Sequence, residues 1–435
     1  MLRRRHASVA IALVLAAGCG GASNGAPSGA SAGPAAAPAS PGPVAASGSA
    51  PAAASAPAAT SAWTLRALPA ARVDVATEPE LRAALARANA SGGNVTIALA
   101  DGVYVLTGTL RVDAPNVALV SASGDRAKVV LRGDAMGPDA AVKNLVRVTG
   151  KSFQLRGLSL ERAGWHLIQI VGEADADDPV IADCALRDAW EQMLKVSYDP
   201  ANPSVGADRG LVQNCLFEYS AGIGPQYYIG GVDAHAAADW TIRGNTFRSI
   251  ASPSRAVAEH AVHFWSGSRN TLVERNVIVD CDRGIGFGLG ERGHVGGSIR
   301  NNFIHHTANG HPYADAGIIL ENSTGTAVYN NTILQEHAYP RSIEYRFAGT
   351  SGGLIANNLV NRPIGARDGG TATLRANVAT ATRASFRLSA TGDLRLAGPI
   401  AGVVDAGVAV PGLVDDIDGE ARPKGAGPDV GADEY

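Results

Sequence analysis

The stretch AVHFWSGSRNTLVERNVI, residues 261–278, joins an alternating apolar segment to an asparagine that two apolar residues follow. An Asn before mostly apolar residues recurs along the chain, at Asn214, Asn245, Asn276, Asn302, Asn331, Asn358 and Asn377. Asn214, Asn245 and Asn276 are equally spaced, and Asp183 lies one further equal step before Asn214. The later steps are somewhat shorter, and the last of them is the shortest. Such self-similarity is typical of a repeat architecture.

Each repeat contains short apolar or alternating segments and shows no helical period. Repeats of this size without a helix predict an all-β fold, a right-handed parallel β-helix, in which one repeat forms one coil. We expect the coils to run from about Val117 to Asn377. The repeated Asn should stack in one column at a bend, where its amide can bond the backbone and the next Asn. Cys184 and Cys215 should then lie one above the other in adjacent coils, either as stacked thiols or as a disulfide.

The segments before and after the repeats differ in character. The run TEPELRAALARANASGG carries apolar residues at helical spacing, which predicts a helix over Glu80–Ala90. A helix there would cover the open end of the β-helix, which could otherwise recruit other chains. The ending DDIDGEARPKGAGPDVGADEY is rich in Gly, Pro and Asp, and we expect it to close the opposite end as loop.

The beginning of the chain indicates export. A basic start and a short apolar run precede LAAGC, so residues 1–19 are predicted to be a signal peptide with lipidation at Cys19; an ordinary cleaved signal is the alternative. Residues 20–62 are almost entirely Ala, Pro, Ser and Gly, which predicts a disordered tether. The β-helix domain is expected over residues 63–435. The protein would then be exported, and either lipid-anchored to the bacterial cell envelope or secreted.

The charge of the chain bears on its partners. A net charge of −3 over 435 residues, without a basic stripe, argues against nucleic-acid binding. No other apolar run is long enough to span a bilayer, so membrane contact is expected through the lipid anchor only. We expect a monomer.

The sequence resembles the exported right-handed β-helix proteins of the pectate-lyase-like superfamily. The resemblance rests on the repeats and on EPELRAALARANASGGNVTIALADGVYVLTGTLRV, which is similar to the opening of lyases that degrade alginate and chondroitin. It implies a polysaccharide substrate and a Ca²⁺ held by acidic residues. The Lys and Arg that those lyases use are absent from the corresponding positions, near Trp265 and Gly288. Because the fold also hosts hydrolases, epimerases and binding proteins, the resemblance implies no single activity.

Aligning the second strand of each repeat by its inward aliphatics predicts two outward columns. One column contains Lys195, Gly231, His263, Gly286, Ile319 and Glu344. The other contains Ser197, Asp233, Trp265, Gly288, Glu321 and Arg346. Their glycines would leave a solvent-facing trough around an aromatic platform for a sugar ring, although a loop could cover it.

Two functions compete for this trough. In a uronate-polysaccharide lyase, His263 or Lys195 would be the base, and Arg283 or a Ca²⁺ near Asp233 would stabilise charge. A non-catalytic surface lipoprotein that binds glycan would need only aromatics and hydrogen bonds. The candidate substrate-binding residues are Trp265, Asp233, His235, Glu321, Glu344 and Arg346.

Three further hypotheses concern charged groups. Glu321 and Glu344 would lie about 8 Å apart by strand spacing, in the range of inverting glycoside hydrolases. Glu321 and Arg346 would alternatively form a structural ion pair. The loop HHTANGHPYAD offers ligands for a metal, although their spacing matches no established pattern. These ligands are His305, His306, His311 and Asp315.

Overall fold

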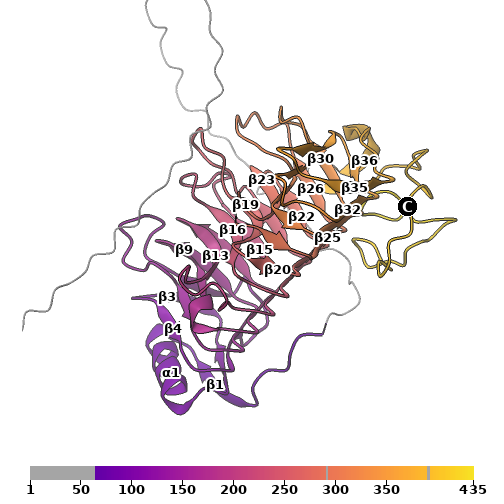
Figure 1. Ribbon diagram of the computed structural model, residues 1–435. Coiled ribbons are helices and arrows are strands. Elements are labelled where there is room, and N and C mark those ends of the chain that lie inside the picture. Colours follow the sequence, from indigo (N-terminus) through magenta and orange to yellow (C-terminus); the bar gives the residue numbers. More distant parts are fainter. Residues whose placement is uncertain (1–63, 291, 389–391) are drawn as a thin grey trace, which may run out of the picture. The chain divides into compact units, whose positions relative to one another are not determined.

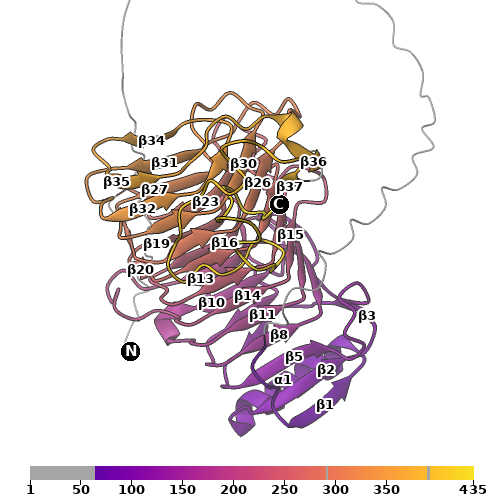
Figure 2. The same ribbon diagram turned by 90° about the vertical axis from the view of Figure 1, so that its right-hand side faces the viewer.

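The computed structural model describes residues 64–290, 292–388 and 392–435. The predicted signal peptide, Cys19 and the tether lie outside these residues. The described part is built from three long parallel sheets, and successive strands along the chain pass from one sheet to the next. It is a parallel β-helix, as the repeats predict. Figure 2 shows the coils stacked from β1 and α1 at one end to β34 and β35 at the other.

Sheet one has 12 strands, with the Asn ladder beginning where they end. They are β1 (Ala71–Val75), β2 (Val95–Leu99), β5 (Val117–Ser121), β8 (Gln154–Arg156), β11 (Val180–Ala182), β14 (Leu211–Gln213), β17 (Thr241–Arg243), β21 (Leu272–Glu274), β25 (Ser298–Arg300), β29 (Ala327–Tyr329), β32 (Gly353–Ala356) and β35 (Ala372–Arg375). The coils therefore begin earlier than Val117, because the short Val- and Leu-rich segments before it already pair in register.

Sheet two has 10 strands that follow the ladder. They are β3 (Gly102–Val105), β6 (Val129–Arg132), β9 (Ser159–Ala163), β12 (Ala185–Ala189), β15 (Leu216–Glu218), β18 (Thr246–Arg248), β22 (Val277–Val279), β26 (Phe303–His306), β30 (Thr332–Gln335) and β33 (Leu359–Val360).

Sheet three also has 10 strands, and its outer face carries the candidate site. They are β4 (Leu110–Val112), β7 (Val146–Val148), β10 (Ile168–Val171), β13 (Gln192–Ser197), β16 (Gly230–His235), β19 (His260–Trp265), β23 (Arg283–Phe287), β27 (Ile318–Glu321), β31 (Ile343–Arg346) and β34 (Ile364–Arg367).

Smaller elements complete the described part. A short sheet joins β20 (Ser268–Arg269), β24 (His294–Val295) and β28 (Ser323–Thr324), and β36 (Phe386–Leu388) pairs antiparallel with β37 (Asp393–Leu396). Two 3-10 turns are η1 (Gly172–Ala174) and η2 (Arg383–Ser385). Among the described residues, no helix has the length and apolarity needed to cross a bilayer.

The predicted helix is present as α1 (Glu78–Ser91). Thr77 caps its first turn together with Glu80 in a reciprocal capping box, and Gly92 ends it in the left-handed conformation. The helix buries Leu81 and Leu85 against the first coil, beside β1, β2 and β4 (Figure 1). It covers this end of the apolar core, as expected.

The asparagines form one buried column, which confirms the ladder. The amide of Asn276 donates to the side-chain oxygen of Asn302 at 3.0 Å, and Asn302 donates in the same way to Asn331 at 2.9 Å. Each side-chain oxygen also accepts the backbone N–H of the asparagine one coil earlier. The column continues to Asn245 and Asn377.

The assignment of Asp183 and Asn214 to this ladder is wrong by one residue. Cys215, and not Asn214, donates its backbone N–H to Asn245. Asn214 instead takes the left-handed turn that precedes the ladder, with φ of 53°, because Asn tolerates that conformation. Cys184 and Cys215 lie in adjacent coils as predicted, and both are free thiols.

The C-terminal segment, which we expected to close the opposite end, packs along the side of the coils. It returns along the coils, where Asn301 donates to the carbonyl of Asp415 and Asn330 donates to the carbonyls of Asp429 and Gly431. Asn357 exchanges two hydrogen bonds with Val408. We call residues 405–435 the clasp, because they bind side chains on three successive coils.

Candidate functional site

The register on the outer face of sheet three differs from the predicted one on β16. Pairing places Lys195 beside Asp233 and Asp233 beside His263, while His235 lies beside Trp265. The prediction makes Val232 the second inward residue of β16. In the structure Ala234 holds that place, and its small side chain gives little apolar signal, so the predicted register on β16 is wrong by two residues. A slip of two leaves every side chain on its expected face. His263 and Trp265 do point outward, with Val262 and Phe264 in the core.

Lys195 and Asp233 form a buried ion pair. The Lys195 ammonium donates to Asp233 Oδ2 and also to His235 Nε2, the latter at 2.8 Å, and Trp265 Nε1 donates to Asp233 Oδ1 at 2.7 Å. Burial would raise the pKa of Asp233, but the charge and hydrogen bond of Lys195, together with His235 and His263, outweigh it and lower that pKa well below its usual value. Burial opposes the charge on Lys195, yet its partners hold the Lys195 pKa above the usual value. Lys195 is therefore a fixed cation and a poor base.

His235 is neutral and locked beside this pair. Burial lowers its pKa to about 3. Because Nε2 accepts from Lys195, the proton lies on Nδ1, which faces Ser266 Oγ at 3.0 Å. The ring stacks on Tyr198, with centroids 4.8 Å apart. His235 therefore orients Lys195 and is not free to bind a sugar.

His263 is buried, so the expected solvent-facing trough is wrong at this position. Its side chain is 1% exposed, and its ring stacks on Trp265 with centroids 5.1 Å apart. Nε2 donates to the Gly288 carbonyl at 3.1 Å, which leaves Nδ1 facing Asp233 at 3.6 Å and Glu259 at 3.7 Å. The covering side chains leave no path for a polymer to reach this ring, and His263 cannot be the base in this arrangement.

Arg283 lies at the other side of the cluster, as expected. Its guanidinium contacts Asp315 at 3.2 Å and approaches Glu259 at 4.0 Å. Gly286 makes room within the cluster, because a Cβ there would lie 2.5 Å from His260 Nε2. The space left by Gly286 is therefore filled by the His260 ring.

A row of titratable side chains that the columns miss lies just before the strands of sheet three. His166, Glu191, Tyr228 and Glu259 precede β10, β13, β16 and β19. His166 Nε2 is 3.7 Å from Glu191 Oε2. Burial raises the pKa of Glu191 and of Tyr228, while Lys195 opposes both shifts. The sequence does carry a sign of this row. The pairs WH, WE, YY and EH recur where the second strand of each repeat begins.

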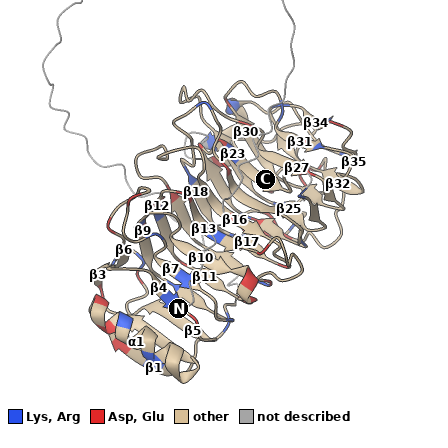
Figure 3. Cartoon of the chain, turned by 60° about the vertical axis from the view of Figure 1, so that its left-hand side comes forward, with Lys and Arg blue, Asp and Glu red and all other residues tan. Residues whose placement is uncertain are grey.

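Exposed aromatic side chains flank this row. Trp165 is 44% exposed, Tyr227 is 50% exposed and Tyr228 is 42% exposed. Large exposed aromatics offer flat apolar faces that can stack on sugar rings. Together with Glu191, they make the edge of sheet three the accessible part of the site. Lysines, arginines and carboxylates are otherwise interspersed along the described coils, without a stripe of one sign (Figure 3).

An open cleft of about 420 Å³ adjoins the other edge of the same strands. Tyr198, Ser266 and Arg292 line it, among others, and the Arg292 guanidinium lies 5.0 Å from the centre of the Trp265 ring. The buried pair of Lys195 and Asp233 therefore lies between an aromatic edge and a cleft that holds an exposed cation.

Three groups of described residues have the composition of metal ligands. Glu259, His260 and His263 offer ligand atoms within 4.8 Å of one another, as do Asp282, His306 and His311, and Asp416, Asp418 and Asp433. The expected Ca²⁺ near Asp233 does not fit, because both oxygens of Asp233 are already bonded and the neighbouring ligands include imidazoles, whereas Ca²⁺ takes oxygen ligands.

The acidic group at the C-terminal segment is already satisfied by the protein. Asp416 accepts three backbone N–H groups, and Asp418 is paired with Arg395.

The remaining predicted residues are structural. Glu321 pairs with Arg346 at 3.1 Å from the adjacent coil, which confirms the ion-pair interpretation. Glu344 is fully buried and bonded by Tyr339 and Arg341. These contacts leave no pair of free carboxylates, so the glycoside-hydrolase arrangement of Glu321 and Glu344 is wrong.

Comparison with known proteins agrees with this geometry at the level of fold. Residues 228–395 match the family described as "Right handed beta helix region". The structure titled "Crystal structure of pectate lyase Pel9A" superposes with a TM-score of 0.57 at 16% identity, covering 80% of this chain and 90% of that one. The chain has the right-handed parallel β-helix fold, which it shares with this pectate lyase.

Two more distant structures are also similar. An alginate lyase from Paenibacillus sp. str. FPU-7 has a TM-score of 0.40 at 14% identity, covering 70% of this chain and 97% of that one. A polygalacturonase from Erwinia carotovora ssp. carotovora has a TM-score of 0.41 at 10% identity, covering 71% and 97%. No curated protein matches the sequence.

Proposed function

We propose that this protein binds and cleaves a uronate-containing polysaccharide along the aromatic edge of sheet three. The observation that carries the proposal is the row of His166, Glu191, Tyr228 and Glu259, which lies on four successive coils beside exposed aromatics. Strands of adjacent coils are about 4.8 Å apart, so the row follows the long axis of the coils. A linear polymer can lie along it and meet one group after another.

The proposed reaction is β-elimination. Glu191 removes the proton from C5 of the uronate, the electron pair forms the C4–C5 double bond, and the C4–O bond breaks. Tyr228 gives its proton to the departing oxygen. Partial burial supports both roles, because it raises the pKa of Glu191 and of Tyr228 above their usual values. The Lys195 ammonium acts on both groups and would stabilise the charge that develops on the uronate.

A non-catalytic glycan-binding protein is the second candidate. The closed network of Lys195, Asp233 and His235 favours it, because none of these groups is free to exchange a proton with a ligand. In that case, the polymer would be held by Trp165, Tyr227 and the cleft near Arg292, without bond cleavage.

One experiment separates these candidates. The purified protein is incubated with a panel of uronate polysaccharides, the ultraviolet absorbance of the unsaturated product is followed, and binding is measured by affinity electrophoresis. Glu191→Gln should slow the lyase by about 10²–10⁴-fold. Glu161→Gln on the outer face of sheet two is the matched control. Binding without product, lost in Trp165→Ala, would establish the second candidate; neither product nor binding with any polymer would refute both.

We also propose that the protein is exported and anchored through Cys19. The sequence LAAGC supports this proposal. Fatty-acid labelling in a bacterial host should mark the wild type and leave Cys19→Ala unlabelled. Equal labelling of both would contradict the anchor.

A further inference from the structure

Beyond the row of His166, Glu191, Tyr228 and Glu259, a second group of side chains that could bind a metal meets at the edge of sheet two. Asp282 follows β22, His306 ends β26, and His311 lies in the loop between β26 and β27. Their ligand atoms all lie within 4.8 Å of one another. Asp282 and His306 are 1% and 4% exposed, so water contributes little to satisfying them.

Two of the three ligand atoms, on Asp282 and His306, have no hydrogen-bond partner. Asp282 Oδ2 accepts the backbone N–H groups of Ser252 at 2.9 Å and Ala258 at 2.8 Å, whereas Oδ1 has no hydrogen-bond partner. His306 Nδ1 donates to the Thr307 carbonyl at 3.1 Å, and its Nε2 has no partner. A buried polar atom without a partner is destabilising, so two together call for a ligand.

His311 completes the arrangement from the loop. Its Nε2 lies 2.9 Å from the Ser252 carbonyl and donates to it, which turns Nδ1 towards Asp282 Oδ1 at 3.5 Å. Nδ1 also lies 2.8 Å from the Tyr313 carbonyl oxygen and 3.2 Å from the Tyr313 backbone nitrogen, contacts that a metal would replace. Histidines that bind metals characteristically donate their second N–H to a carbonyl, as His306 and His311 both do.

We propose that Asp282, His306 and His311 form a binding site for a divalent transition-metal ion of the Zn²⁺ class. Two imidazoles and one carboxylate are a donor set that such ions accept, with further positions open to water. A hard ion such as Ca²⁺ would require oxygen ligands in place of the imidazoles. The site shares no residue with the row proposed to bind polysaccharide, although Asp282 is bonded to Ala258, which is next to Glu259 of that row. A bound ion would fix the loop between β26 and β27 onto the preceding coil.

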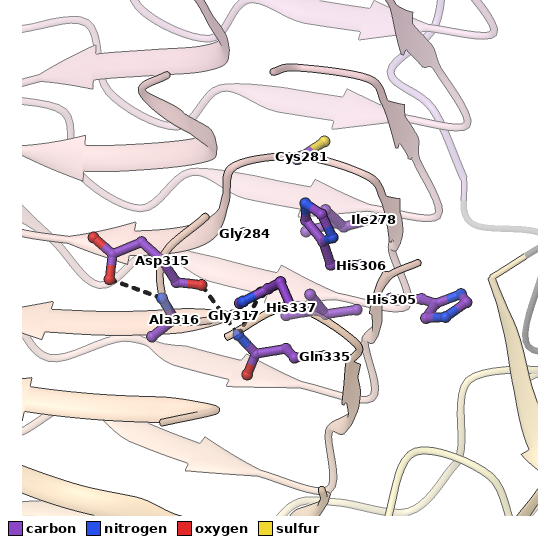
Figure 4. Close-up of a pocket in the computed structure, with 11 residues that line it drawn as sticks. Ile278, Cys281, Gly284, His305, His306, Asp315, Ala316, Gly317, Gln335 and His337 are labelled. Atoms are coloured by element: carbon purple, nitrogen blue, oxygen red, sulfur yellow. Dashed lines mark hydrogen bonds between the residues drawn. The ribbon is translucent and has the colours of Figure 1, made fainter. Parts of the chain in front are cut away.

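Two nearby side chains that could bind a metal, His305 and Asp315, have other partners and do not belong to this site. His305 points to the opposite side of β26 from His306 (Figure 4), where its Nε2 lies 3.0 Å from Glu336. Asp315 is paired with Arg283. Of the four ligands that the loop HHTANGHPYAD offered, only His306 and His311 remain, and the third ligand comes from the coil before.

The test uses full-length protein stripped with a chelator and titrated with Zn²⁺ against a chromophoric competitor. Co²⁺ is used in parallel, because its visible absorption reports on imidazole ligation. One tight ion per chain is expected. Asp282→Asn and His311→Gln should weaken binding by more than about 100-fold, since loss of outer-shell partners alone costs 10–100-fold. His305→Gln is the matched control and should bind as the wild type does.

Three outcomes would overturn the proposal. The wild type could bind neither ion tightly, which would leave Asp282 and His311 as an ordinary ion pair. Both variants could retain full affinity. The ion could be lost in His263→Gln and kept in Asp282→Asn, which would place it at Glu259, His260 and His263. His311→Gln lies in a surface loop, so it keeps the test valid if Asp282→Asn does not fold; circular dichroism checks both.

Discussion

Buried histidines make the folded protein sensitive to acid. Burial lowers the pKa of His294 and His235 to about 3, and that of His166 to about 4. In the unfolded chain a histidine titrates near pH 6.5. Because the folded pKa values are depressed, the unfolded chain binds more protons below about pH 6.5, and stability is lost as the pH falls from there towards 4 and 3.

His294 is the clearest test of this effect, because desolvation is the cause of its shift. It is fully buried, stacked on Phe287 and 3.0 Å from Thr271 Oγ1. Its pKa shift predicts a loss of about 2 kcal/mol between pH 7.5 and pH 5. Urea unfolding at both pH values should show that loss in the wild type and a smaller one in His294→Gln. The same pH dependence in both proteins would contradict the assignment.

The ion pair of Lys195 and Asp233 should be costly to break from one side. Lys195→Met leaves a buried carboxylate without its cation, and we expect a loss of about 3–5 kcal/mol in the free energy of unfolding. Adding Asp233→Asn should recover part of it. Lys151→Met, which removes an exposed pairing with Asp175, should cost about 1 kcal/mol or less. Denaturant titration of the four proteins tests the pair; equal losses for both lysines would argue against it.

Alternation along the strands was enough to predict that His263 and Trp265 point outward. It could not predict that His263 is buried, since the loops that precede and follow the strands have no period from which their course can be read. For the same reason, the alternation did not predict the positions of Glu191 and Tyr228, which lie in loops just before strands. Their WE and YY pairs become visible only when the repeats are aligned at the strand starts.

Among the elements, the asparagine ladder should be the most sensitive to truncation. Asn302→Ala removes bonds to Asn276, Asn331 and the Val273 carbonyl inside the core. Each buried group left unpaired costs about 1–3 kcal/mol, so a loss of about 3 kcal/mol or more is expected. Asn202→Ala on an exposed loop should change stability by less than about 0.5 kcal/mol. Thermal and urea unfolding of both variants measure the difference.

The three cysteines of the described residues should be inert in the folded protein. Burial raises the pKa of Cys215 and of Cys281, and a thiol must ionise to react. Alkylation followed by peptide mass spectrometry should leave Cys184, Cys215 and Cys281 unmodified in native protein and label all three after unfolding. A peptide that links Cys184 to Cys215 would show a disulfide in place of two thiols.

The ladder was predictable from Asn245 onward because identical residues recur where the chain bends. The prediction is wrong at Asp183 and Asn214, since Asp and Asn also suit the left-handed turn one residue earlier. The sequence contains both uses of the same residue type, and only the pairing of Leu216 with Thr246 separates them.

For the whole described part, we expect α1 to keep the first coils from associating with other chains. Leu81 is completely buried beneath the helix, so Leu81→Asp should detach α1 and expose the apolar end of the core. Open β-edges promote association, and light scattering after size exclusion should show oligomers. Arg87→Asp on the exposed side of the same helix is the control. A monomeric Leu81→Asp protein would show that α1 is not needed as a cap.

The clasp has a mechanical consequence. It comes from the end of the chain, yet it binds Asn301, Asn330 and Asn357 on coils that were completed much earlier. A pull on the C-terminus would therefore load the clasp first and peel its bonds one at a time before the last coils could unwind. The coils are thus protected by a segment that follows them in the sequence.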